Sequence, residues 1–163
     1  MHVADDVSAW RYPWVPPKLE LKSMPDLDYV VLADYVRQDN GTVHIMAAGI
    51  DTFSLPTAVL PTAVPVGIAL RIMFSSRDEV GSEHSLTLRF STGDSALLVA
   101  SQRFLTPPAP PGVPAHWRTA LGIAIRLTLP FPGHGDYALE IVLDDDPRLS
   151  RRLDLRAIEP TPG

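Results

Sequence analysis

The sequence predicts an all-β protein, folded as a two-layer antiparallel β-sandwich of about eight strands with Greek-key connections. In the stretches between prolines, apolar residues recur at every second position, as expected for half-buried strands. Turn residues separate these stretches, and no segment shows a helical apolar face over three turns. The 163 residues suit one domain, expected over residues 26–159, with an arm at 1–25 and a tail at 160–163.

The first 25 residues are expected to form an extended arm. Trp10, Tyr12 and Trp14 lie there among closely spaced prolines, which exclude an internal strand. An arm of this kind either covers its own sheet or reaches another subunit, and large aromatic side chains strengthen both kinds of contact. Both arrangements stay open at this point.

The first two strands are expected as a hairpin. Residues 29–36 are apolar on both faces, and Asp39-Asn40-Gly41 follows them. Asn and Gly tolerate positive φ and suit a tight reversal into a second strand at 42–49. The repeated Leu-Pro-Thr-Ala-Val at 55–64 is too short for a structural repeat and is expected as a stiff crossover loop.

Two later stretches alternate most clearly. In Val66–Phe74 every second residue is large and apolar, whereas the residues between include Gly67 and Ala69. The stretch Leu121–Leu129 repeats this pattern. Such alternation predicts one face in the core and the other toward water. The remaining strands are expected at 85–91, 95–104, 137–143 and 149–158.

A family resemblance supports this organisation. The residues Leu32-Ala-Asp, Asn40-Gly41 and Ala48-Gly49-Ile-Asp51 resemble a family of uncharacterised bacterial, specifically actinobacterial, proteins of unknown function. That resemblance implies no catalytic residue. In addition, Pro132-Gly133-His134-Gly135-Asp136-Tyr137 is similar to the entry of a late strand in many immunoglobulin-like domains, which implies an immunoglobulin-like sandwich.

The charge balance and the residue types exclude several classes of function. The net charge is −5, with only 14 Lys and Arg residues, whereas nucleic-acid binding depends on clustered positive charge. Because the chain has no cysteine, it has no disulfide, thiolate metal site or cysteine nucleophile. Neither a Gly-x-Ser-x-Gly elbow nor a glycine-rich phosphate loop occurs. We therefore expect no cofactor and no nucleic-acid partner.

The start of the chain and its longest uncharged stretch bear on location. Asp5 and Asp6 lie where a secretory signal would be basic and then apolar, so a cytoplasmic location is expected. The uncharged residues 55–70 contain three prolines and end at Arg71. A membrane-spanning helix needs about 20 apolar residues, so no membrane association is expected.

Asp34 and two arginines are candidates for a structural ion pair. Asp34 lies mid-strand among apolar residues, and a buried carboxylate there would need a partner. Arg71 and Arg126 are each the lone charge of an apolar strand and could supply it. The alternatives are that Asp34 lies at an exposed edge position or is a functional carboxylate. Together with Arg89 the two arginines could also form a basic stripe, or simply a solvated sheet face.

Histidines and acidic turns give no metal site by spacing. The five histidines are not spaced as ligands on one element. Asp144–Asp146 could hold a hard cation or be a solvated turn, which is the commoner role of such residues. His134 is expected to be a turn residue, and His84 is expected at a strand end near the rim.

These observations favour a non-enzymatic interaction or structural subunit. Its partner would be another protein or a second copy, bound through the aromatic arm or an uncovered sheet face. The alternative is a small-ligand or carbohydrate-binding module, with Trp117, His116 and the loop 107–114 as the lip of a site. An enzyme would need a histidine and carboxylate brought together at long range.

Overall fold

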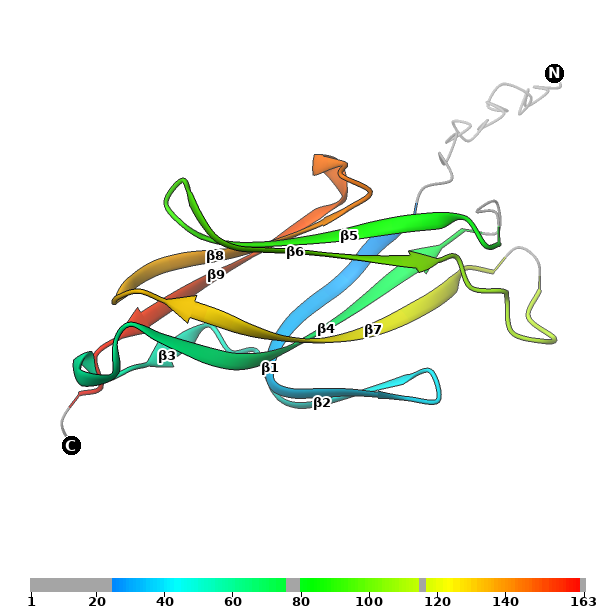
Figure 1. Ribbon diagram of the computed structural model, residues 1–163. Coiled ribbons are helices and arrows are strands. Elements are labelled where there is room, and N and C mark those ends of the chain that lie inside the picture. Colours follow the sequence, from blue (N-terminus) through cyan, green and yellow to red (C-terminus); the bar gives the residue numbers. More distant parts are fainter. Residues whose placement is uncertain (1–24, 76–79, 115–116, 162–163) are drawn as a thin grey trace, which may run out of the picture.

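The computed structural model describes residues 25–75, 80–114 and 117–161, and it confirms the all-β sandwich (Figure 1). Within these three described ranges, nine strands form two facing sheets. Sheet A has the order β2-β1-β4-β7, with β1 (Asp26–Asp39), β2 (Thr42–Ala48), β4 (Thr62–Phe74) and β7 (Thr119–Phe131). Sheet B has the order β3-β9-β8-β5-β6, with β3 (Thr52–Ser54), β5 (Glu83–Thr92), β6 (Ser95–Leu105), β8 (Gly135–Leu143) and β9 (Ser150–Ile158). Short 3-10 turns lie at Thr57–Val59 and Pro147–Leu149.

The strand pairing is antiparallel except for β3, which pairs in parallel with β9. Strand β3 was not expected, because three residues are too few to show alternation. Strand β4 begins at Thr62, so residues 62–64, which were expected in the crossover loop, belong to the strand. It also includes Pro65. Pro65 is tolerated because β1 pairs with β4 only as far as Gly67, so that part of β4 has no ladder on the β1 side.

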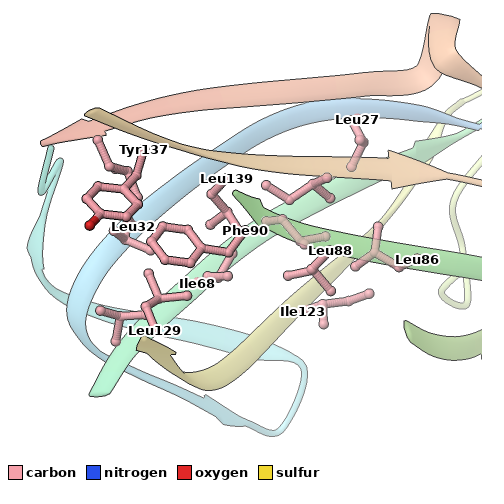
Figure 2. Packing of buried hydrophobic residues seen from close by; sticks show 14 of the residues in the cluster. Leu27, Leu32, Ile68, Leu86, Leu88, Phe90, Ile123, Leu129, Tyr137 and Leu139 are labelled. Atoms are coloured by element: carbon pink, nitrogen blue, oxygen red, sulfur yellow. The ribbon is translucent and has the colours of Figure 1, made fainter. Parts of the chain in front are cut away.

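The core lies between the sheets and is built from the large residues of the alternating pattern. Ile68 on β4, Leu129 on β7, Phe90 on β5 and Leu139 on β8 are fully buried, and Figure 2 shows them packed together. The Tyr137 ring stacks on Phe90 at a centroid distance of 5.3 Å. The predicted core face of each of these strands is therefore confirmed.

Tyr137 also closes one end of the core. Its hydroxyl donates to the carbonyl oxygen of Gly133 at 2.6 Å. A hydrogen bond from a strand-entry tyrosine to the backbone a few residues upstream is the tyrosine corner of many sandwich domains.

The hairpin of β1 and β2 folds back over sheet A. After Ala33 the strand β1 leaves β4 and pairs only with β2. Its turn is tight, with φ of 48° at Asn40 and 79° at Gly41, as the Asn-Gly pair predicts. In Figure 1 the hairpin lies beneath β4 and β7 as a partial third layer.

Small residues on β4 and β7 provide the floor for this hairpin. A Cβ atom on Gly67 would come within 2.8 Å of Val36, and one on Gly122 would come equally close to Val43. Ala69 lies two residues after Gly67, on the same face of β4, and is fully buried. The prediction that this face points to water is therefore wrong here, because the hairpin covers it.

Polar contacts hold the hairpin in place. The Gln38 side-chain amide donates to the carbonyl oxygen of Gly122 at 3.0 Å. Arg126 on β7 donates through Nε to the carbonyl oxygen of Val36 at 3.3 Å, and its guanidinium lies 4.4 Å from the centre of the Tyr35 ring. Both contacts join β1 to β7, its second neighbour in sheet A.

Among the described residues, no helix is long and apolar enough to cross a membrane.

We expect Gly67→Ala to lower the free energy of unfolding by about 1–3 kcal/mol, the usual cost of overpacking. The added methyl group would meet the backbone nitrogen of Val36 as well as its side chain. Gly133→Ala is the matched control, because nothing lies within 4 Å of a Cβ there. Denaturant unfolding of the three chains measures the difference. Equal midpoints would contradict the close packing of the hairpin.

Candidate functional site

The two sides of the sandwich differ in how their edges are protected. On one side the edge strands are short, with seven residues in β2 and three in β3. On the other side β6 has eleven and β7 thirteen. In the described part of the chain no strand pairs with the outer edge of either long strand. A long free edge can pair with a strand of another chain. Proteins usually block such edges.

A half-buried apolar seam runs where the edges of β6 and β7 meet. These two strands belong to different sheets but contact each other. Their inward side chains pack on the core and yet stay partly accessible, because no further strand covers them. We call this set the edge seam: Leu97, Leu98 and Phe104 of β6, and Leu121, Ile125 and Leu127 of β7.

Exposed apolar residues extend the edge seam at one end. Leu105 ends β6 and is 57% exposed, and Trp117 precedes β7 and is 58% exposed. Trp117 was predicted as the lip of a ligand site, together with His116, which lies outside the described residues. Neither hollow that we describe below has Trp117 in its lining. Trp117 lies two residues before the start of β7, the strand that carries Leu121 of the edge seam.

His84 anchors β6 to the rest of the sandwich. Its Nδ1 lies 2.7 Å from an oxygen of Asp144, and its Nε2 lies 2.9 Å from the hydroxyl of Thr106. Its ring stacks on Phe104 of the edge seam at 5.5 Å. The second oxygen of Asp144 accepts from the backbone N–H of Ser85 at 2.8 Å. The end of β6 is thus tied to β5 and to the turn after β8.

This chain of contacts occupies both nitrogens of His84. Thr106 is only 3% exposed, so its hydroxyl is inaccessible to a substrate. Among the described residues no group of three or more His, Cys, Asp or Glu side chains could hold a metal ion. Asp144, which the sequence offered as a cation ligand, instead positions His84. The predicted rim position of His84 agrees with the structure, whereas its partners were not foreseen.

His134 has a comparable structural role in another turn. Its Nε2 lies 2.7 Å from the carbonyl oxygen of Leu55 and 3.4 Å from a carboxylate oxygen of Glu159. It therefore joins the loop after β3 to the start of β8 and the end of β9.

The predicted ion pair of Asp34 with Arg71 or Arg126 does not form among the described residues. Arg71 pairs with Asp28, with 2.6 Å between Nε and the carboxylate, and lies over the Tyr29 ring. Asp34 is exposed and makes no ion pair among the described residues. It lies where β1 bends away from β4, so its apolar sequence neighbours do not bury it. Of the arrangements expected for Asp34, the structure therefore shows the exposed one and not an ion pair with Arg71 or Arg126.

Asp34 and Arg126 border the same hollow of about 280 Å³ on the outer face of sheet A. The bend of β1 forms one wall, and β4 and β7 form the floor. The lining includes Asp34, Tyr35, Pro65, Arg126 and Thr128. Arg126 belongs to β7, so one side of this hollow is formed by a strand with a free edge.

Of the two arrangements considered for Arg71, Arg89 and Arg126, the basic stripe is absent from the described residues. Arg71 and Arg126 lie in sheet A, whereas Arg89 lies in sheet B, opposite Glu140. Glu140 lies in turn opposite Arg152. The outer face of sheet B is therefore a charge-alternating surface, as the solvated alternative predicted.

A second hollow, of about 500 Å³, lies on sheet B and includes Asp51 and Tyr137 in its lining. Its arginines are paired, because Arg152 lies 2.8 Å from Asp154 and Arg156 lies 3.0 Å from Asp136. The hydrogen bond and the negative charge of Asp154 raise the pKa of Arg152.

The aromatic residues of the predicted arm, Trp10, Tyr12 and Trp14, lie outside the described residues. Nothing in the structure therefore tests where they bind.

A comparison with protein families matches residues 28–156, from β1 to β9, to a family described as a family of unknown function (DUF6941). A comparison with curated proteins gives no match.

We expect Asp144→Ala to lower the free energy of unfolding by about 1–3 kcal/mol, because the N–H of Ser85 and the His84 ring lose their acceptor. Asp145→Ala is the matched control, since both residues have a φ of 53° and suffer the same backbone strain. Chemical unfolding measures both changes. An Asp144→Ala loss no larger than that of Asp145→Ala would contradict the anchoring role.

Proposed function

The chain belongs to the DUF6941 family of unknown function, and we propose that it is a non-enzymatic interaction or structural subunit. Its binding surface is the edge seam, and its partner is another protein or a second copy. The observation that carries this proposal is the pair of long, free edge strands with half-buried apolar side chains between them. Strand addition at such an edge is a common mode of peptide recognition.

The surroundings of the edge seam support this location. The outer face of sheet A is partly covered by its own hairpin, and the outer face of sheet B carries paired charges. The exposed Leu105 and Trp117 continue the apolar surface at the end of the seam. Aromatic side chains beside an apolar patch are typical of interfaces.

The proposal of a non-enzymatic role is supported by how the titratable turn residues are used. His84 and His134 are engaged by neighbouring residues in contacts that join strands and loops. These contacts position structural elements at the rim. We place the protein in the bacterial cytoplasm, a proposal that rests on the sequence alone.

We also propose an immunoglobulin-like topology. In support, β1, β4 and β7 face the four strands β9, β8, β5 and β6. With β2 and β3 set aside, this is the order A-B-E opposite G-F-C-C′. The tyrosine corner at Tyr137 lies at the start of the strand that corresponds to F.

A small-ligand module is the second candidate, favoured by the hollow of about 500 Å³ on sheet B. Its lining of arginines and aspartates suits a small ligand that carries both charges. A carbohydrate fits less well, because sugars stack on exposed aromatic rings and Tyr137 is only 5% exposed.

The interaction proposal is tested by a charge placed in the edge seam. We expect Ile125→Lys to lower self-assembly or partner recovery by about tenfold or more, equivalent to about 1.4 kcal/mol, since inward charges block edge pairing. The half-buried position lets the ammonium reach water, and circular dichroism verifies the fold. Sedimentation velocity and affinity recovery with tagged chain give the readouts.

Ile158→Lys is the matched control, because it makes the same substitution at an exposed residue of β9, a strand that pairs with β3 on one edge and with β8 on the other. Retention of all assembly and recovery by Ile125→Lys would overturn the edge seam as the binding surface.

A further inference from the structure

We propose that the free edge of β7 binds residues 18–22 of a second copy of this chain, as an added antiparallel strand with Glu20 opposite Arg126. The resulting assembly is a reciprocal dimer in which each copy donates its segment. This inference rests on the proposed interaction function and names its partner.

The two segments are complementary in sequence. The donated segment reads Lys18-Leu-Glu-Leu-Lys22 and contains no proline, although prolines lie on both sides of it. The acceptor reads Ile125-Arg-Leu127, with Ile125 and Leu127 in the edge seam. Residues directly opposite in a ladder share one face of the sheet. Leucines therefore extend the seam, and Glu20 meets Arg126 on the outer face.

The guanidinium of Arg126 can bind the carboxylate of Glu20 in addition to its present partners. Its Nε donates to the Val36 carbonyl oxygen and its guanidinium stacks on Tyr35. Its side chain is exposed, and among the described residues its two terminal nitrogens have no hydrogen-bond or ion-pair partner. The nearby hollow of about 280 Å³ leaves room for a carboxylate side chain. A carboxylate is the ligand that a guanidinium binds best.

Distance excludes donation by the same chain. Asp26 aligns with Met73 of β4, which aligns with Ala120 of β7. Glu20 beside Arg126 would therefore lie about 20 Å along the strands and about 14 Å across three strand spacings from Asp26, a separation of about 25 Å. The six residue steps from Glu20 to Asp26 span at most about 21 Å. The donor must be another copy.

Light scattering after size exclusion tests the assembly with full-length chains. We expect the wild-type chain to form a dimer, and the double variant Leu19→Asp, Leu21→Asp to raise the dimer dissociation constant about tenfold or more. The double variant Leu19→Val, Leu21→Val is the matched control and should keep the dimer, because valine fits an apolar strand face.

Disulfide trapping tests the register of the added strand. Because the sequence contains no cysteine, a disulfide can form only between the introduced cysteines. A mixture of Lys18→Cys chain with Thr128→Cys chain should give a linked pair on mild oxidation, because opposite residues lie within disulfide distance. A mixture of Lys18→Cys with Asp154→Cys should not, because Asp154 lies on the outer face of β9 in the other sheet.

Three outcomes would overturn the inference. The first is a wild-type chain that stays monomeric over the whole concentration range. The second is a chain carrying both Lys18→Cys and Thr128→Cys that links only within itself. The third is loss of partner binding by Ile125→Lys without any effect of the Leu19 and Leu21 changes. That last result would retain the proposed function while assigning the edge to a different protein.

Discussion

The fold depends on the difference in size between the two faces of β4 and β7. Large aliphatic residues on one face fill the core between the sheets. Gly67 and Gly122 on the other face leave a floor so shallow that Val36 and Val43 of the hairpin approach the strand backbones. One alternating pattern therefore builds both the sandwich and its third layer. It also explains why β1 can leave β4 at Ala33 without exposing the strand beneath.

This arrangement leaves β7 covered on its inner face, partly covered on its outer face and free along one edge. Its inner face lies on the core, and part of its outer face lies under the hairpin, with Arg126 and Gln38 joining the two layers. Strand β6 is likewise held by the contact of His84 with Thr106. Side-chain contacts therefore hold both edge strands on the sandwich, and an edge that is already in place binds an added strand with little cost of ordering its own backbone.

Much of the fold follows from local pattern, because alternation of side chains along a strand is a local property. It predicted the core faces of β4, β5, β7 and β8 and the Asn40-Gly41 hairpin. Alternation does not show what covers a face of small residues, so the hairpin layer was missed. Alternation also could not decide whether Asp34 is buried and paired or exposed, because the bend after Ala33 depends on packing with β4. His84, Asp144 and Thr106 are far apart in sequence, and only the sheet order brings them together.

A binding surface made of strand edges, as proposed above, needs no sequence motif. Strand addition takes its affinity from main-chain hydrogen bonds, which every residue except proline can supply. Specificity then needs only alternating side chains of suitable size and charge, such as an arginine between two aliphatic residues. A segment of this kind looks like any other half-buried strand until the sheet order shows that one of its edges has no neighbour. The information lies in topology, which spacing along the chain does not encode.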